Sequence, residues 1–409
     1  MSKTPKHVIF LGAGASASSG YPMADDLRRE WLASADGLRV RFKRAMGLGL
    51  TVEPRQNWIL EEFERWIEKY RVPLQLFREG GFGTIDEFCY LLRGTESKMA
   101  SDLKFVLRFV FGIHSPEEQF TDSDYYPFIQ KLFDPKKLSA LRSDVVVMSF
   151  NYDPYLEWLL QRGLSIRAGA LAGGVRGAPL DPRVEAAVLS GLGHGTEGVK
   201  AIREGDSFCL LKLHGSAAWP LPARNVTQYS LTPHVSFDQF FTGDLEKRLR
   251  ALTAQFGESE VPIVFPWEIM ADNGTMLAKN EFILRDPVYS DQVEGFRAGG
   301  RAATDPDTHE IFQAIWGRAR EEVQVADRIS FVGLSMHEYL MPGFKYLFSG
   351  RGGKIVLGGT DRNFDGGEPA PPRSVYARIV QMRDGTCPSM GWNAPDFRQD
   401  FAEFIQKDV

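Results

Sequence analysis

Three side chains capable of acid–base or hydrogen-bond chemistry follow two short apolar segments of the chain. Asn151 and Asp153 come after the apolar run Asp144–Ser149, and His214 comes after the run Phe208–Leu213. A histidine can act as a general base near neutral pH, and an asparagine can orient a water molecule or a hydroxyl group. These three residues are therefore the candidates for a catalytic centre, with His214 as the candidate base.

Each of these side chains also has a structural interpretation. Asn151 and Asp153 can cap the helix expected over Pro154–Gln161, and Pro154 at the first helical position strengthens this interpretation for Asp153. A lone histidine is commonly a structural hydrogen-bonding group. From residue types alone, a catalytic and a structural role both remain open for these positions.

Two glycine turns follow two further apolar segments. Gly12-Ala13-Gly14-Ala15-Ser16 comes after His7–Leu11 and, with Ala17, satisfies the pattern G-x-G-x-x-A. Glycines in such a turn let the backbone approach a pyrophosphate closely, and the helix that follows offers its N–H groups. The alternative is a strand–helix turn that binds nothing. The second turn, Gly333-Leu334-Ser335, resembles a ribose- or phosphate-contacting turn in which Ser335 supplies a hydroxyl group.

The elements that must position these residues are short buried strands and amphipathic helices. Glycines or polar residues end the apolar runs, as is typical of buried strands in a parallel sheet. The expected strands are His7–Leu11, Asp144–Ser149, Phe208–Leu213, Arg328–Val332 and Lys354–Leu357. Apolar residues at three- and four-residue spacing predict helices over Met23–Leu32, Asn57–Tyr70 and Glu87–Leu92.

Strands that alternate with helices predict an α/β fold: a Rossmann-like, doubly wound parallel sheet with a helical insertion domain. We expect the core in residues 1–32 and 138–365, the insertion in 33–137 and a C-terminal extension in 366–409. Glycine and proline make Ala168–Glu204 and Asp361–Arg373 loop candidates. Ligands of such sheets bind at the carboxyl ends of the strands, so the four motifs should line one site.

Composition limits the classes of function. The chain has 409 residues, 43% of them hydrophobic, and a formal net charge of −5, which argues against a mainly electrostatic mode of nucleic-acid binding. Its three cysteines, Cys89, Cys209 and Cys387, cannot form a four-thiolate zinc site and make a poor disulfide framework. We expect a cytoplasmic protein without a signal peptide or a membrane span.

Two common nucleotide-binding classes fit the first glycine turn poorly. No Gly-Lys-Ser/Thr follows it, so it is not a Walker loop. A dehydrogenase needs a second strand that ends in an acidic residue about 20 positions further on, to hold the adenine ribose. Here the corresponding stretch, around Glu30 to Asp36, is helical in pattern, which disfavours an oxidoreductase.

Taken in order, these segments resemble the sirtuin superfamily, and the likeness spans about residues 6 to 360. The sirtuin Gly-Ala-Gly-x-Ser and Ser-Gly-Ile-Pro correspond to Gly12–Ser16 and to Ser19-Gly20-Tyr21-Pro22. The family's Thr-Gln-Asn-Ile-Asp corresponds to Ser149-Phe150-Asn151-Tyr152-Asp153. Its catalytic His-Gly corresponds to His214-Gly215, and its Gly-Thr-Ser to Gly333-Leu334-Ser335.

The departures from that pattern concern protein deacylation. Deacylating sirtuins carry a zinc module with two C-x-x-C pairs, which this chain lacks, so no zinc is expected. Met23-Ala24-Asp25 stands where many deacylases have Asp-Phe-Arg, and Phe150 replaces a glutamine. The chain looks more like the sirtuin-like NAD hydrolases of bacterial anti-phage defence, which often carry Phe-Asn-Tyr-Asp, Lys-Leu-His-Gly-Ser and Ile-Asp-Glu-Phe. The last of these is present as Ile85–Phe88, which by itself predicts packing and helix capping.

The resemblance implies that NAD⁺ is the substrate and that the nicotinamide–ribose bond is cleaved. It implies His214 as the proton acceptor, Asn151 as the residue that positions water and ribose, and Asp153 as a partner of the carboxamide or of positive charge. Gly12, Ala13, Gly14, Ser16, Tyr21 and Pro22 would bind the dinucleotide, and Gly333 and Ser335 its adenosine side. A homo-oligomer, or control by a separate sensor or ATPase partner, is expected. The alternatives are a non-catalytic NAD or ADP-ribose sensor and a protein deacylase.

Overall fold

The part of the chain that the computed structural model describes includes the segments around all four motifs. It comprises residues 6–23, 26–32, 34–45, 57–81, 83–92, 99, 102–104, 106–107, 110–111, 123–134, 141–157, 159–160, 209–217, 263–278, 308–361, 375–386, 390–392, 396–398 and 400–409. The predicted loop Ala168–Glu204 and most of the predicted loop Asp361–Arg373 lie outside these residues.

A parallel sheet forms the centre of the described structure, which confirms the predicted α/β class. Its strands run in the order β3-β2-β1-β4-β5-β6, and every pairing is parallel. The first five strands match the five predicted ones, although β5 is longer than expected. They are β1 (His7–Leu11), β2 (Val145–Ser149), β3 (Cys209–Lys212), β4 (Arg328–Val332) and β5 (Gly353–Thr360).

The register of the central strands aligns their carboxyl ends. His7 at the start of β1 lies opposite Val145 and Arg328, and Leu11 at its end lies opposite Ser149 and Val332. Ser149 is in turn paired with Lys212 of β3. The segments that follow β1, β2, β3 and β4 therefore leave the sheet at one common edge.

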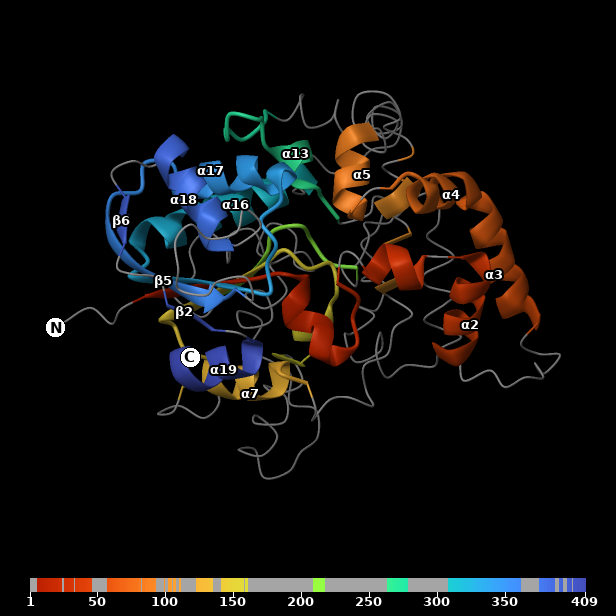
Figure 1. Cartoon of the computed structure of the whole chain (residues 1–409), viewed down its shortest axis with the longest axis horizontal. Helices are drawn as coiled ribbons and strands as arrows, with labels where there is room; N and C mark the ends of the chain where they lie inside the picture. Colours follow the sequence, from red (N-terminus) through yellow and green to blue (C-terminus); the bar gives the residue numbers. More distant parts are fainter. Residues whose placement is uncertain are drawn as a thin grey trace, which may run out of the picture.

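Helices lie on both sides of this sheet (Figure 1). One side carries α16 (Thr308–Val325), α17 (Met341–Phe348) and α18 (Val375–Thr386), and the other carries α7 (Tyr125–Leu132) and α19 (Phe401–Asp408). Because both faces are covered, every residue of β1 and β2 is buried, which explains why these strands are continuous apolar runs without alternation.

Two short strands extend the sheet beyond β5, and the sequence pattern did not predict them. Within the predicted C-terminal extension, β6 (Met390–Trp392) and β7 (Asp396–Arg398) both pair with β5. Helix α19 begins at an N-cap, Asp400, whose carboxylate accepts a hydrogen bond from the backbone N–H of Glu403. The extension thus contributes to the central sheet.

The segment between β1 and β2 is largely helical where it is described. Helices α2 (Ala35–Ala45), α3 (Asn57–Lys69) and α4 (Arg71–Glu79) lie together to one side of the sheet (Figure 1). Helix α5 (Ile85–Leu92) lies nearer the sheet and contacts the short helix η5 (Glu338–Leu340). There the hydroxyl group of Thr84 donates to the Tyr339 hydroxyl at 3.2 Å.

The first turn of the chain differs from its prediction. The expected helix over Met23–Leu32 is a π-helix, η2, over Leu27–Trp31, and Met23 precedes it as coil. A 3₁₀-helix, η1 (Ala13–Ser19), begins within the glycine turn itself, and the apolar periodicity did not reveal it. After β2, residues 155–157 and 159–160 are helical, in agreement with the predicted helix there.

Among the described helices, none combines the length and the apolar character that crossing a membrane requires.

A buried histidine makes the stability of this fold dependent on pH. The Nε2 atom of His7 lies 2.8 Å from the Ser330 hydroxyl group. Burial, and next the charges of Arg328 and Arg142, lower the pKa of His7 from 6.5 to about 3. Asp408 and Asp144 oppose this shift. Below pH 6.5 the unfolded chain therefore binds a proton that folded His7 refuses until about pH 3, so acidification destabilises the fold.

We predict that His7→Gln makes the stability of the protein less sensitive to acid. Between pH 6.5 and pH 4.5 the unfolding free energy of the variant should fall less steeply than that of the wild type, by about 1.4 kcal/mol per pH unit, the value for one proton. Urea denaturation at several pH values measures both slopes. Equal slopes would show that the pKa of His7 is the same in the folded and the unfolded chain.

Candidate active site

The turns after β1 and β4 touch each other through their backbones. Gly12 N donates to Val332 O, and Gly14 N donates to Gly333 O, each at 2.9 Å. A Cβ on Gly12 would lie 2.5 Å from the Leu334 Cα, and one on Gly14 would lie 2.9 Å from the Gly333 Cα. Close packing of two strand ends thus requires these glycines, independently of any ligand. The N–H groups of Gly12 and Gly14 are used in these backbone hydrogen bonds.

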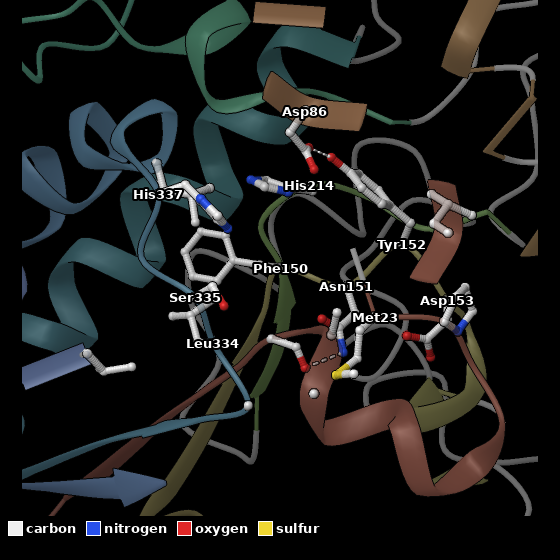
Figure 2. A pocket seen from close by; sticks show the side chains of 18 of the residues that line it. Met23, Asp86, Phe150, Asn151, Tyr152, Asp153, His214, Leu334, Ser335 and His337 are labelled. Carbon is white, nitrogen blue, oxygen red and sulfur yellow. Dashed lines mark hydrogen bonds between the residues drawn. The ribbon is translucent and has the colours of Figure 1, made fainter. Parts of the chain in front are cut away.

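A cavity opens at the carboxyl edge of the sheet, beside this contact (Figure 2). Residues that follow β1, β2, β3, β4 and β5 all line it, as the rule for parallel sheets predicts. The predicted site residues among its lining are Gly12, Ala13, Gly14, Pro22, Asn151, Asp153, His214, Gly333 and Ser335.

Asn151 donates hydrogen bonds to groups behind the cavity wall, and these bonds fix its side chain. Its Nδ2 atom donates to Gly12 O at 3.0 Å and to Ser16 Oγ at 2.9 Å, and its backbone N–H donates to Ser149 Oγ at 3.1 Å. An amide nitrogen has two protons, and both are donated. The carbonyl oxygen Oδ1 is therefore the atom of this side chain that suits a ligand hydroxyl group or a water molecule.

Ser16 has a positioning role rather than a place in the cavity lining. Its hydroxyl group donates to Asp153 Oδ2 at 2.8 Å, lies 2.9 Å from Asn151 Nδ2 and lies 3.0 Å from the Tyr125 hydroxyl. One donor and two acceptor positions exhaust a hydroxyl group, so Ser16 has none left for a phosphate. Tyr21, the other predicted residue outside the lining, packs against Phe111 and Tyr155.

Asp153 caps a helix and also lines the cavity. It lines the cavity, and its Oδ1 atom accepts the Tyr155 N–H at 3.2 Å, which caps the helix after β2. Burial raises the pKa of Asp153, while Lys212 and the Ser16 hydrogen bond oppose the shift. The buried Lys212 ammonium donates to Asp153 O at 2.7 Å and pairs with Glu157 at 3.3 Å. A buried cation thus lies behind this wall.

His214 lies between two aromatic rings and is 3% exposed. Tyr152 stacks on it with ring centroids 5.5 Å apart, and Phe150 meets it edge-on at 5.1 Å. Burial, with the Lys212 charge second, lowers the pKa of His214 to about 3, against a hydrogen bond to the Phe150 backbone. Nε2 has no hydrogen-bond partner among the described residues. The Phe150 bond therefore belongs to Nδ1, and the neutral ring offers Nε2 as a proton acceptor.

Two acidic residues of the cavity were not predicted as site residues. Asp86 lines it from α5, and its carboxylate accepts a hydrogen bond from the Tyr152 hydroxyl. Asp361 follows β5, lines the cavity and is buried. The rule of strand ends would have found Asp361 had the predicted strand continued to Thr360. The Ile85–Phe88 motif contained Asp86, which we interpreted only as packing and capping.

The described cysteines and acids do not form a metal site. Cys89 and Cys209 are buried free thiols. Among the residues with described positions, no group of three or more histidine, cysteine, aspartate or glutamate side chains is arranged to hold a metal ion.

We predict that Gly333→Ala destabilises the fold strongly. Gly333 has a φ of +59°, and a Cβ there would collide with the backbone of Gly14 and Ala15. Gly350 has a comparable φ of +79° but open space around its Cα, so Gly350→Ala serves as the control. We expect a loss of about 1–2 kcal/mol for the control from strain alone, and more than about 3 kcal/mol for Gly333→Ala. Chemical denaturation measures both, and equal losses would contradict the backbone contact.

No protein-family model matches the chain, and no curated protein sequence matches it. Evidence about function therefore comes from the cavity: a neutral buried histidine whose Nε2 atom has no hydrogen-bond partner among the described residues, an asparagine with a fixed amide group, and two glycine turns in contact.

Proposed function

We propose that this chain is an NAD⁺ glycohydrolase that releases nicotinamide and ADP-ribose. The observation that supports this best is the convergence of His214 and Asn151, from two different strand ends, on the cavity that both glycine turns also line. A base and a water-orienting amide suit the hydrolysis of a dinucleotide, and a glycine-lined wall lets the ligand approach the backbone closely.

The fold supports the same proposal. We propose that the strand order β3-β2-β1-β4-β5 belongs to a Rossmann-like, doubly wound domain, with α2 to α5 as its helical insertion. Dinucleotides bind such domains at the carboxyl ends of the strands. Among dinucleotides, the ordered resemblance of the motifs to sirtuin-like NAD hydrolases favours NAD⁺ as the ligand.

In this proposal the diphosphate of NAD⁺ lies along the two glycine turns. Because Gly12 and Gly14 have already donated their N–H groups to β4 and its turn, their contribution is close approach and not hydrogen bonding. The adenosine lies toward Thr360 and Asp361, at the end of β5, and the nicotinamide ribose lies toward Asn151 and His214.

Hydrolysis then breaks the bond between the pyridinium nitrogen and the ribose C1′ atom. The bonding electron pair leaves with nicotinamide, which departs neutral, and C1′ acquires oxocarbenium character. Water held by Asn151 Oδ1 adds to C1′ and transfers a proton to Nε2 of His214, which returns it to solvent.

We predict that His214→Ala and Asn151→Ala each lower the rate of nicotinamide release by at least about 100-fold, the order contributed by a general base or by one positioned polar side chain. Purified wild type and variants are incubated with NAD⁺, and nicotinamide and ADP-ribose are quantified by chromatography. Circular dichroism establishes that each variant is folded.

A matched control removes a buried histidine that does not line the cavity. His309 lies 3.0 Å from Leu277 O through Nε2, so His309→Gln should keep the wild-type rate. Either cavity variant with near-wild-type turnover would remove that residue from the mechanism. Binding of NAD⁺ without any nicotinamide release by the wild type would instead make the protein a dinucleotide-binding module.

A further inference from the structure

Asp86 faces the cavity from the first turn of α5, although its neighbours cap this helix. Thr84 Oγ1 accepts the Glu87 N–H at 3.0 Å, and Glu87 Oε2 accepts the Gly83 N–H at 2.7 Å. The Asp86 carboxylate points instead toward the Tyr152 hydroxyl, with His214 beside this pair (Figure 2). Within the Ile85–Phe88 motif the capping interpretation thus fits Glu87, which Thr84 assists, whereas Asp86 needs another explanation.

The charge of Asp86 lacks a counter-charge within the described structure. Two other deeply buried carboxylates each pair with a lysine: Glu157 with Lys212 at 3.3 Å, and Glu268 with Lys104 at 2.7 Å. Asp86 is 8% exposed and makes no ion pair with any described residue. Buried charges in proteins are normally paired, so a carboxylate left unpaired at a cavity wall suits a cationic ligand.

The surroundings of Asp86 suit a flat ring. Phe150, Tyr152 and Tyr339 line the cavity, and Tyr152 is the residue that donates to Asp86. Aromatic side chains provide apolar faces for a planar ligand and attract a cationic one. This end of the cavity thus combines aromatic surface with one negative charge.

We infer that Asp86 supplies the counter-charge for the cationic pyridinium ring of NAD⁺, and that it makes the cavity select the oxidised dinucleotide over the reduced one. The inference rests on the proposed function, since it concerns the nicotinamide end of the same cavity. NADH has the same carboxamide, ribose and diphosphate groups as NAD⁺, but its dihydropyridine ring is neutral. A charge-based preference therefore separates the two ligands where a hydrogen bond to the carboxamide does not.

The test measures binding of three probes at pH 8 by calorimetry. The probes are carba-NAD⁺, in which a methylene group replaces the oxygen of the nicotinamide ribose so that the ligand keeps its charge and resists hydrolysis, together with NADH and ADP-ribose. Burial raises the pKa of Asp86 to about 6, so its carboxylate is ionised at this pH. Wild type is compared with Asp86→Asn, which removes the charge and keeps an oxygen that accepts the Tyr152 hydroxyl.

We expect the wild type to bind carba-NAD⁺ about tenfold or more tightly than NADH, and Asp86→Asn to abolish most of this preference by weakening carba-NAD⁺ alone. ADP-ribose, which has no pyridine ring, should bind both proteins equally. Glu87→Gln is the matched control, because it removes an exposed carboxylate from the same turn of α5 and should leave the preference unchanged.

The outcomes separate this inference from the proposed function. An unchanged ratio of the two affinities in Asp86→Asn, or an equal weakening of all three probes, would overturn the role of Asp86 even if the wild type releases nicotinamide. An Asp86-dependent preference in a protein that releases no nicotinamide would support the inference and contradict hydrolysis. Absence of binding by all three probes would overturn both.

Discussion

The contact between the glycine turns after β1 and β4 determines the geometry of the candidate site. Gly14 donates to Gly333 across a distance that no side chain can enter, so the two strand ends meet backbone to backbone. The segment from Gly12 to Ser16 is thereby fixed against the sheet, and Ser16 and Gly12 together fix the amide group of Asn151. The glycines of the first turn are therefore needed for the packing that positions Ser16 and Asn151, whether or not the turn binds a phosphate.

Two groups at the wall of the cavity each lack a hydrogen-bond partner or a counter-charge within the described part of the chain, whereas Ser16 and Lys212 behind the wall are hydrogen-bonded. Behind the wall, the Ser16 hydroxyl uses every position it has, and the Lys212 ammonium contacts both a backbone carbonyl and a carboxylate. At the wall, Nε2 of His214 lacks a partner and Asp86 lacks a cation among the described residues. Buried polar groups are nearly always satisfied, so such exceptions that face one cavity are typical of a ligand site.

Much of this arrangement was predictable from the sequence, because buried parallel strands appear as short apolar runs and because ligands bind where such strands end. That reasoning located the five main strands and nine of the residues that line the cavity. It failed where contacts distant in sequence decide the outcome. The Asp86 side chain faces the cavity because of how α5 packs. A hydrogen bond from Thr84 to Tyr339, 255 positions away in the sequence, holds the start of α5 in place. The Ser16 hydroxyl group has no free hydrogen-bonding position only because Tyr125, distant in sequence, contacts it. Strands β6 and β7 are too short to show a hydrophobic pattern.

In the proposed reaction, water attacks the ribose carbon of NAD⁺ in this cavity. The most direct measurement is mass spectrometry of the products formed by the wild-type protein from NAD⁺ in water enriched in ¹⁸O. Hydrolysis in this cavity gives equal amounts of nicotinamide and ADP-ribose, with one ¹⁸O atom at the C1′ carbon of the freshly released ADP-ribose. NAD⁺ that stays intact, although the folded protein binds it, would contradict the account.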